Sequence, residues 1–259
     1  MTSRHYEYVI VANETSQHIS TLRRLVAGGF AGTILIEKPL ANPGDAFELA
    51  GARPMFVAYQ LRFDPLMTML HDLLSSETLI SAEIRACSYL PEWRAGRDYR
   101  QTESASIRAG GGVLRDLSHE LDYTLWLFGP WRRLTAIGGH LSALEIDTDD
   151  SQAVLVETTR CRSVVVSMNY LDRQEERWII VNTHRGTIKA DLFNRTLVSN
   201  GQTLFSGSSA DVDRTYVDEN RAMLTGAFGH ACSIAEGLAV VQMVAAIETA
   251  GREGRWVNA

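Results

Sequence analysis

Residues 33–43 read TILIEKPLANP, an apolar run that ends abruptly in charged residues. The run from Thr33 to Glu37 is short and β-branched, as expected of a buried strand in a parallel sheet. It stops at a Glu-Lys-Pro triplet whose lysine, Lys38, is one of only two in the chain, the other being Lys189. Ligands of open parallel sheets bind beyond the carboxyl ends of the strands. Lys38 is therefore a candidate functional group, although a solvated lysine after a strand is the common alternative.

Similar strand signals lie on both sides of this segment. The runs Tyr8–Ala12 and Met55–Gln60 are apolar, and each is followed by a polar loop. Residues 15–29 have helical spacing, and Asn42 and Pro43 are suited to the N-cap and first position of another helix. Strands that alternate with helices predict βαβ units and a parallel sheet.

The pattern changes after about residue 62. An amphipathic helix after Asp64, a long strand from Leu79, one helix over 110–129 and a series of strands over 131–205 are expected, followed by a helical tail over 217–252. Gly229, Gly237 and Gly251 are expected to interrupt or end helices in that tail. The fold class is therefore α/β plus α+β: a partial Rossmann-like parallel sheet over 1–62, then a domain over 63–259 with an open, mainly antiparallel β-sheet flanked by helices. The C-terminal helices can pack back on the first part.

Composition excludes several classes of function. The formal net charge is −6 and no basic stripe occurs, which argues against nucleic acid as a partner. No apolar run approaches the length of a membrane span and the N-terminus lacks a signal-peptide pattern, so we expect a cytoplasmic protein without a membrane partner. Cys87, Cys161 and Cys232 are far apart and odd in number, which argues against a disulfide framework or a zinc site.

A second motif, GGGVLRDLSHELD, starts at Gly110. Its Asp116, His119 and Asp122 are spaced i, i+3, i+6, so neighbours in the series share a helix face. A carboxylate at this spacing can raise the basicity of the histidine and fix its tautomer. The alternatives are an N-capping aspartate with a surface histidine, or a metal site, which lacks a third ligand.

A third motif is the loop YLPEWRAGRDYR, residues 89–100. Aromatic and arginine side chains alternate in it: Tyr89, Trp93 and Tyr99 with Arg94, Arg97 and Arg100. Aromatic faces and guanidinium forks suit sugar rings and carboxylate or phosphate groups. A polar surface loop with incidental aromatics is the alternative.

Together, these motifs resemble the Gfo/Idh/MocA family of nicotinamide-dependent sugar oxidoreductases over about Tyr8–Val257. IEKPLA is similar to that family's E-K-P segment, AYQLRFDP to its G-Y-N-x-R-F-x-P, and GGGVLRDLSHELDYTLWLFG to its glycine-led Asp/His helix. The Asp-to-His spacing is commonly four there and is three here. The sequence DLSHELDY is similar to that of a subgroup associated with surface-polysaccharide and nonulosonic-acid gene clusters.

The resemblance implies a role for each matching position. Lys38 would hydrogen-bond the reacting hydroxyl, His119 would be the general acid/base, and Asp116, or else Asp122, would assist it. The residues near the nicotinamide of NAD or NADP would be Asn13, Thr15, His18, Glu37, Lys38 and Gln60. The residues facing a small, sugar-type substrate would be Tyr89, Trp93, Arg97, Tyr99, Arg100 and Asp122. No metal is implied, and a cis Lys38–Pro39 bond is expected.

The chain departs from the family at its beginning, which resembles the family's fourth strand. About two βα units, on the order of 60 residues, have no counterpart, and with them the G-x-G-x-x-G turn. The chain is therefore expected to be N-terminally truncated and to bind NAD or NADP weakly on its own. Tyr8–Ala12 would be an apolar edge, covered by the N-terminal tail or by a second copy. A homodimer or higher oligomer through the open sheet and this strand is expected.

Three functions remain open at this stage. The first is an oxidoreductase that acts on a sugar or sugar-nucleotide hydroxyl or carbonyl. The second is a non-catalytic sugar-binding or partner subunit that has lost dinucleotide binding. The third is a cofactor-free lyase or epimerase in which His119 and Lys38 transfer protons alone.

Overall fold

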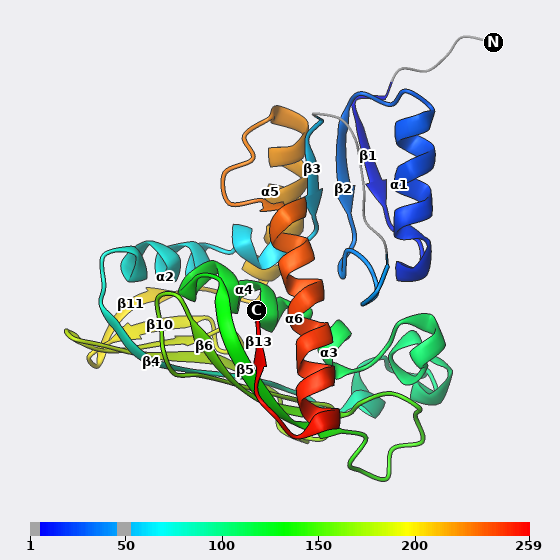
Figure 1. The fold of residues 1–259 in the computed structure, drawn as a ribbon. Coiled ribbons are helices and arrows are strands. Elements are labelled where there is room, and N and C mark those ends of the chain that lie inside the picture. Colours follow the sequence, from blue (N-terminus) through cyan, green and yellow to red (C-terminus); the bar gives the residue numbers. More distant parts are fainter. Residues whose placement is uncertain (1–5, 46–52) are drawn as a thin grey trace.

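Two β-sheets organise the chain (Figure 1). The computed structural model describes residues 6–45 and 53–259. Sheet A has the strand order β1-β2-β3-β12, and the nine-stranded sheet B has the order β11-β10-β9-β8-β4-β7-β6-β5-β13. The first three strands of sheet A are parallel, whereas sheet B is antiparallel except at the β4–β7 pair. The predicted fold class is confirmed.

The strands are short in sheet A and longer in sheet B. Sheet A contains β1 (Tyr8–Val11), β2 (Thr33–Ile36), β3 (Met55–Val57) and β12 (Cys232–Ser233). Sheet B contains β4 (Leu79–Cys87), β5 (Trp131–Gly139), β6 (Ser151–Thr158), β7 (Val164–Asn169), β8 (Glu176–Thr183), β9 (Gly186–Asp191), β10 (Thr196–Ser199), β11 (Gln202–Ser206) and β13 (Val257–Asn258).

The helices lie between and beside the sheets. They are α1 (His18–Ala27), α2 (Pro65–Ser75), α3 (Val113–Asp116), α4 (Ser118–Phe128), α5 (Ala210–Thr225) and α6 (Ile234–Glu253). Short 3₁₀ turns occupy η1 (Thr15–Gln17), η2 (Gln60–Phe63), η3 (Leu90–Glu92), η4 (Tyr99–Gln101), η5 (Glu103–Ala105) and η6 (Ile107–Ala109).

Two helix starts follow from local sequence. Asp64 caps α2 by accepting a hydrogen bond from the backbone N–H of Leu66 at 2.8 Å, with proline at the first position. At α6, Ser233 and Glu236 form a reciprocal capping box. These caps fix the entry of both helices into the core.

Sheet A is buried on both faces. Ile34, Ile36 and Val57 join the main core on the face of α1 and α6, and Leu35 packs with Met223 of α5 on the other. The antiparallel strand β12 pairs with β3. Residues from the end of the chain thus complete the first sheet, and the division at residue 62 stays a prediction.

β1 forms one edge of sheet A. Among the described residues, no strand pairs with its outer side, and Ile10 is 46% exposed there. The prediction that the N-terminal tail covers this edge concerns residues 1–5, which lie outside the described residues. That a second copy of the chain covers it stays a prediction.

Sheet B has one covered face and one open face. Helices α2, α4 and α6 lie over the covered face (Figure 1), where Ile84, Val154 and Val166 are buried. On the open face, Leu155 and Val165 are cross-strand neighbours and are 38% and 40% exposed. An exposed, partly apolar sheet face of this kind is suited to an interface.

Three expectations about helices are wrong. The helix expected over 110–129 is entered through its glycines and ends at Gly129 as predicted, but it breaks at Leu117 into α3 and α4. Gly237 and Gly251 lie inside α6, which ends at Gly254. A side chain at position 237 would meet Val57 Cγ2 at 2.5 Å, so this glycine allows α6 to approach β3 closely rather than stopping the helix.

Other boundaries also shift. Residues 42–45 form a turn in which the Asp45 backbone N–H donates to the carbonyl of Asn42 at 3.1 Å. The remainder of the helix expected from Asn42 and Pro43 lies outside the described residues. α5 begins at Ala210, seven residues before the expected helical tail. β3 ends at Val57, so it is shorter than the strand expected over Met55–Gln60, and 3₁₀ turn η2 begins at Gln60.

α6 is long and apolar enough, by length and composition, to cross a membrane, with a mean hydropathy of 1.4. The expectation that no apolar run reaches this length is therefore wrong. In the fold, α6 packs on β5 and α4, and its Met243, Val244 and Ile247 lie in the main core. Burial of this kind is typical of a core helix, and the absence of a membrane partner stays a prediction.

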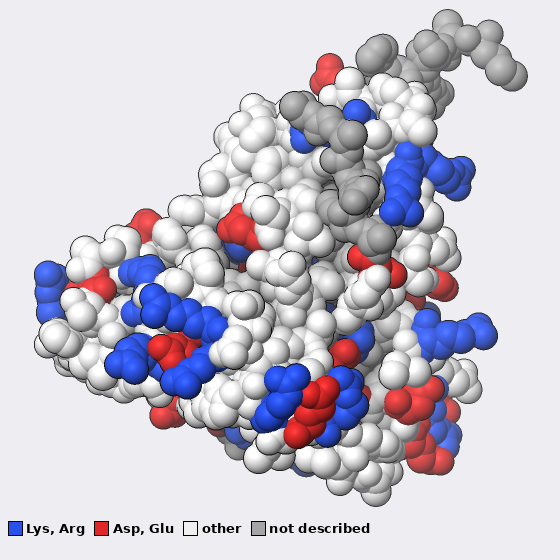
Figure 2. Space-filling model, in the orientation of Figure 1, with Lys and Arg blue, Asp and Glu red and all other residues white. Residues whose placement is uncertain are grey.

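Charged side chains of both signs lie close together on the visible face (Figure 2). This mixture agrees with the small net charge of −6. That nucleic acid is not a partner stays a prediction.

Candidate active site

Lys38 directly follows β2 and reaches across to helix α3. The Lys38–Pro39 peptide bond is cis, as predicted. The ammonium of Lys38 donates to the backbone carbonyl of Asp116 at 2.7 Å and lies 3.4 Å from that of Arg115. The last carbonyls of a helix have no partner within the helix, so the end of α3 supplies acceptors that hold the lysine.

His18 fixes the loop that carries Lys38. The side chain is 1% exposed, and its Nε2 lies 2.9 Å from the carbonyl oxygen of Asn13 while its Nδ1 lies 3.1 Å from that of Pro39. It thereby joins the loops that follow β1 and β2. Asn13, in turn, donates to the hydroxyl of Thr21 at 2.9 Å. His18 is thus engaged with backbone groups of the protein itself.

Thr15 and Gln60 lie at the carboxyl edges of β1 and β3. Thr15 begins turn η1, and a side chain at Gly110 would pass 3.6 Å from its Cβ. Gln60 donates to the hydroxyl of Tyr216 of α5 at 2.9 Å. The carboxyl edge of sheet A therefore faces both the glycine segment before α3 and helix α5.

His119 is in the first turn of α4 and is only 7% exposed. Its Nδ1 is buried with no hydrogen-bond partner among the described residues, and the ring of Tyr59 packs edge-on at 5.3 Å. Burial, followed by the positive charges of Lys38 and Arg177, holds the pKa of His119 well below its usual range. A neutral imidazole at neutral pH can accept a proton.

Burial and neighbouring charges, including that of Asp116, act on Lys38 in opposite directions. Burial lowers the pKa of the Lys38 ammonium, and Asp116, Glu120 and Glu37 oppose that shift. The Asp116 carboxylate accepts a hydrogen bond from the hydroxyl of Tyr170 at 2.6 Å. Asp116 thus acts on Lys38 through both its backbone carbonyl and its charge.

The expected pairing of Asp116 with His119 is not formed. The helix breaks between them at Leu117, so the i, i+3 relation no longer places the two side chains on one helix face. The Asp116 carboxylate accepts a hydrogen bond from the hydroxyl of Tyr170 instead.

Asp122 lies in a buried ion pair rather than on the substrate side. Its two carboxylate oxygens accept from Nη2 and Nε of Arg62 at 2.7 and 3.0 Å, and both side chains are 3% exposed or less. Arg62 also pairs with Glu236 of α6 at 2.7 Å. These contacts join η2, α4 and α6, which corrects the substrate-binding prediction for Asp122.

Sequence reasoning missed a second ion pair beside the site, between a half-buried arginine and a buried glutamate. The guanidinium of Arg177, on β8, donates to both carboxylate oxygens of Glu120 at 2.7 and 3.1 Å. Glu120 is fully buried and also accepts from the hydroxyl of Tyr123 at 3.1 Å. Arg177 is thereby held where its charge acts on both His119 and Lys38.

The first half of the 89–100 loop adjoins the site. Trp93 donates to the hydroxyl of Ser88 at 2.8 Å and packs edge-on against Tyr170 at 5.1 Å. The Arg173 guanidinium lies 3.2 Å from the ring centre of Tyr89. A cavity of about 510 Å³ opens here, lined by Ser88, Tyr89, Glu92, Trp93, Arg94, Leu117, Arg173 and Glu175. Since Leu117 directly follows Asp116, this cavity is the candidate substrate side.

The second half of the loop is engaged elsewhere. Arg100 pairs with Asp98 and Glu145 at 2.8 and 2.9 Å, and the hydroxyl of Tyr99 accepts from the backbone N–H of Glu145 at 3.2 Å. Arg97 lines a separate hollow of about 450 Å³. The structure thus divides the aromatic–arginine loop between two places, and only Tyr89 and Trp93 of the predicted substrate residues line the cavity beside Leu117.

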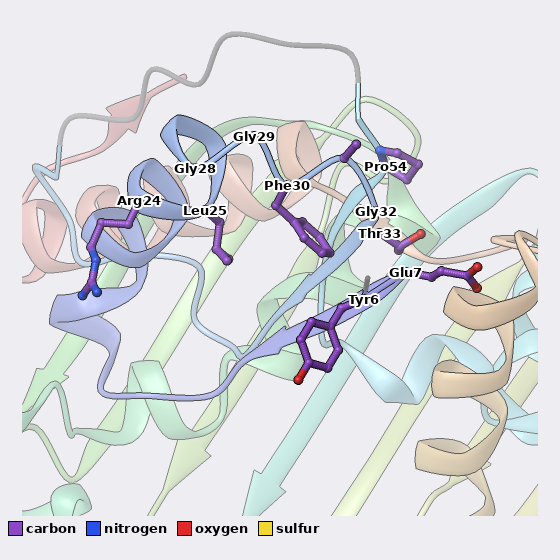
Figure 3. Close-up of a pocket in the computed structure, with 11 residues that line it drawn as sticks. Tyr6, Glu7, Arg24, Leu25, Gly28, Gly29, Phe30, Gly32, Thr33 and Pro54 are labelled. Carbon is purple, nitrogen blue, oxygen red and sulfur yellow. The ribbon is translucent and has the colours of Figure 1, made fainter. Parts of the chain in front are cut away.

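A larger hollow, of about 700 Å³, lies at the opposite edge of sheet A (Figure 3). Tyr6, Phe30, Thr33 and Pro54 line it, and Thr33 begins the strand that ends near Lys38. It is therefore distant from the candidate site. Among residues 6–45 and 53–259, no group of three or more His, Cys, Asp or Glu side chains is placed to hold a metal ion.

Part of the chain matches a known protein family. Residues 78–189 match the family model described as the GFO/IDH/MocA C-terminal domain. A search of curated protein sequences gave no match.

Solved structures share the fold. GenD2 from gentamicin A biosynthesis, in complex with NAD, is 22% identical with a TM-score of 0.79, over 98% of this chain and 78% of that one. Levoglucosan dehydrogenase in complex with NADH is 16% identical with a TM-score of 0.79, over 97% and 79%. The WlbA dehydrogenase from Bordetella pertussis, in complex with NADH and UDP-GlcNAcA, is 16% identical with a TM-score of 0.74, over 99% and 80%.

Proposed function

We propose that this chain, which belongs to the Gfo/Idh/MocA family through its domain at residues 78–189, is an oxidoreductase that interconverts a hydroxyl and a carbonyl of a sugar or sugar nucleotide with NAD or NADP. One observation carries the proposal. The ammonium of Lys38 and the buried imidazole of His119, whose Nδ1 has no hydrogen-bond partner among the described residues, come together beyond the carboxyl edge of a parallel sheet. Ligands of such sheets bind at that edge.

The residues at this edge fit the nicotinamide end of the cofactor. Lys38 and Gln60 follow two neighbouring strands, and the buried Nδ1 of His119 has a free hydrogen-bonding position. The connections after β1 and β3, residues 12–14 and 58–59, contain no glycine, so neither is a phosphate-binding turn. When bound, the cofactor would accept or return a hydride.

The protein residues would transfer the proton of the substrate hydroxyl and stabilise the charge on its oxygen. His119, held neutral, takes the proton of the substrate hydroxyl, and Lys38 donates a hydrogen bond to the same oxygen as negative charge develops on it. Arg177 supplies a further positive charge close by. Tyr89 and Trp93 would orient the sugar ring, because aromatic side chains line the adjoining cavity.

Substrate and setting are proposals as well. GenD2, levoglucosan dehydrogenase and WlbA are described with NAD, NADH or a sugar nucleotide, which supports a sugar-type substrate. We infer that the reaction serves surface-polysaccharide or nonulosonic-acid metabolism in the cytoplasm.

Titration of the chain with NADH should give a saturable change in nicotinamide fluorescence at micromolar to millimolar concentration. We expect this change because the nicotinamide would bind at the carboxyl edge of sheet A, around Lys38 and Gln60. The variant Arg214→Gln, on the exposed face of α5, is the matched control and should bind as the unmodified chain does. An absence of saturable binding up to several millimolar NADH would contradict the proposal.

We further propose a homodimer through the open face of sheet B, with the β1 edge available for a larger assembly. Ile137 is 80% exposed on β5, near the exposed Leu155 and Val165. Sedimentation equilibrium should give a dimer for the unmodified chain and a monomer for Ile137→Glu, because a charge would be buried at the interface. The control Ile107→Glu, exposed outside sheet B, should remain dimeric. A monomeric unmodified chain at tens of micromolar would exclude the dimer.

A further inference from the structure

Helix α5 covers one side of the carboxyl edge of sheet A. Its Tyr216 accepts a hydrogen bond from Gln60 at 2.9 Å, and its Asn220 accepts one from the hydroxyl of Tyr8 at 2.9 Å. Residues 216 and 220 are one helical turn apart. They tie α5 to the first residue of β1 and to the turn that follows β3, and Glu219 lies between them on the same turn.

Glu219 is a buried carboxyl group without a partner. It is 2% exposed, and neither a side-chain hydrogen bond nor an ion pair joins it to another described residue. The charged and titratable groups around it are Glu37 after β2, Asp122 on α4, Tyr8 on β1 and Tyr216 on its own helix. The charge of Asp122 is matched by Arg62, whereas Glu37 forms no ion pair within the described ranges.

Burial, followed by the charges of Glu37 and Asp122, raises the pKa of Glu219 to about 8. Glu37 directly precedes Lys38, and its charge acts on Lys38 and on Tyr8. Met223, one helical turn after Glu219, packs against Leu35 near the end of β2, and Glu37 directly follows that strand. The two carboxyl groups therefore lie on the α5 side of the same strand end that presents Lys38 to the candidate site.

This inference rests on the proposed function. The oxidised nicotinamide ring carries a positive charge and the reduced ring carries none. We propose that Glu219 and Glu37 form an acidic pair that favours binding of the oxidised over the reduced nicotinamide at the Lys38–His119 site. Glu219 acts here through its charge on the bound cofactor and is a positioning group, not a proton donor to the substrate.

Calorimetric dissociation constants for NAD⁺ and NADH at pH 6.5 and pH 9 test this inference. In the unmodified chain, the preference for NAD⁺ over NADH should rise roughly five- to tenfold with pH, as expected for one additional charge nearby. Glu219→Gln keeps the shape of the side chain and should abolish the rise. Asp213→Asn removes a charge from the exposed face of the same helix and should preserve it.

The outcomes separate the two proposals. If neither dinucleotide binds to the unmodified chain, the proposed function fails and the inference fails with it. If both bind and the preference is independent of pH, or persists in Glu219→Gln, only the inference is overturned.

Stability without cofactor gives a second readout. Since the pKa of Glu219 is raised in the folded state, its contribution to stability is complete below its ordinary value of 4.5 and is lost as the pH rises through about 8. The urea midpoint of the unmodified chain should therefore fall relative to that of Glu219→Gln between pH 5 and pH 9. A constant difference between the two would show that Glu219 is ionised throughout and would overturn the inference.

Discussion

Replacing His119 with asparagine should lower kcat for oxidation of the substrate hydroxyl by about 10²- to 10⁴-fold, the usual contribution of a positioned general base. Asparagine retains polarity but cannot accept the proton. Burial, Lys38 and Arg177 hold the pKa of His119 well below 6.5. The acid limb of the kcat/KM profile should therefore lie below pH 6.5, because only the neutral ring is active in this direction. Steady-state kinetics over pH 4.5–9 measure both effects.

A histidine outside the site provides the matched control. His184 is exposed in the β8–β9 hairpin, and His184→Asn should leave both kcat and the acid limb unchanged. If His119→Asn retains more than about a tenth of kcat, His119 is not the general base.

Replacing Arg62 with methionine should lower the free energy of unfolding by about 3–5 kcal/mol. The substitution leaves the Asp122 carboxylate, which is 1% exposed, without the cation that binds both of its oxygens. It also breaks the contact from η2 to Glu236 of α6. Urea or guanidinium unfolding measures the change. Arg214→Met removes an exposed pair with Asp218 on α5 and should cost no more than about 0.5 kcal/mol.

A double variant distinguishes an unpaired charge from lost packing. Arg62→Met combined with Asp122→Leu removes both partners and should recover most of the lost stability, because no isolated charge remains buried. If the single variant were as stable as the unmodified chain, the pair would have to be open to solvent, in conflict with its burial.

Local patterns in the sequence predicted the strand framework well. The runs beginning at Tyr8, Thr33 and Met55 are strands of one parallel sheet, as their short apolar, β-branched sequences predict, and the central strand β2 is the most deeply buried. The position of Lys38 at a strand end follows from the same short segment, whereas its cis bond to Pro39 is implied by the family resemblance.

Local patterns failed where the backbone departs from regular geometry. The spacing of Asp116 and His119 implies one helix face only if the helix is continuous, and it breaks at Leu117. Leu117 is apolar, and nothing in its own residue type indicates the break. The bond between Tyr170 and Asp116, which spans 54 residues, replaces the expected pairing.

Ion pairs between residues far apart in the chain could not be predicted from the sequence either. Glu120 and Arg177 are 57 residues apart, and Arg62 and Asp122 are 60 apart. Glu219 comes to sheet A from the end of the chain. The partner of each of these charged residues depends on how the sheets and helices pack, and residue spacing within one segment does not predict that packing. The roles of the candidate site residues accordingly remain predictions from the resemblance and from their placement.

The break at Leu117 also has a thermodynamic consequence for Lys38. It leaves the carbonyls of Arg115 and Asp116 free to hold the ammonium before any ligand arrives. A free lysine side chain carries about 2 kcal/mol of rotamer entropy. Here much of that entropy is lost when the chain folds, so little remains to be lost when a substrate binds. The interrupted helix thus makes Lys38 a preorganised donor, and folding rather than binding bears the cost of its order.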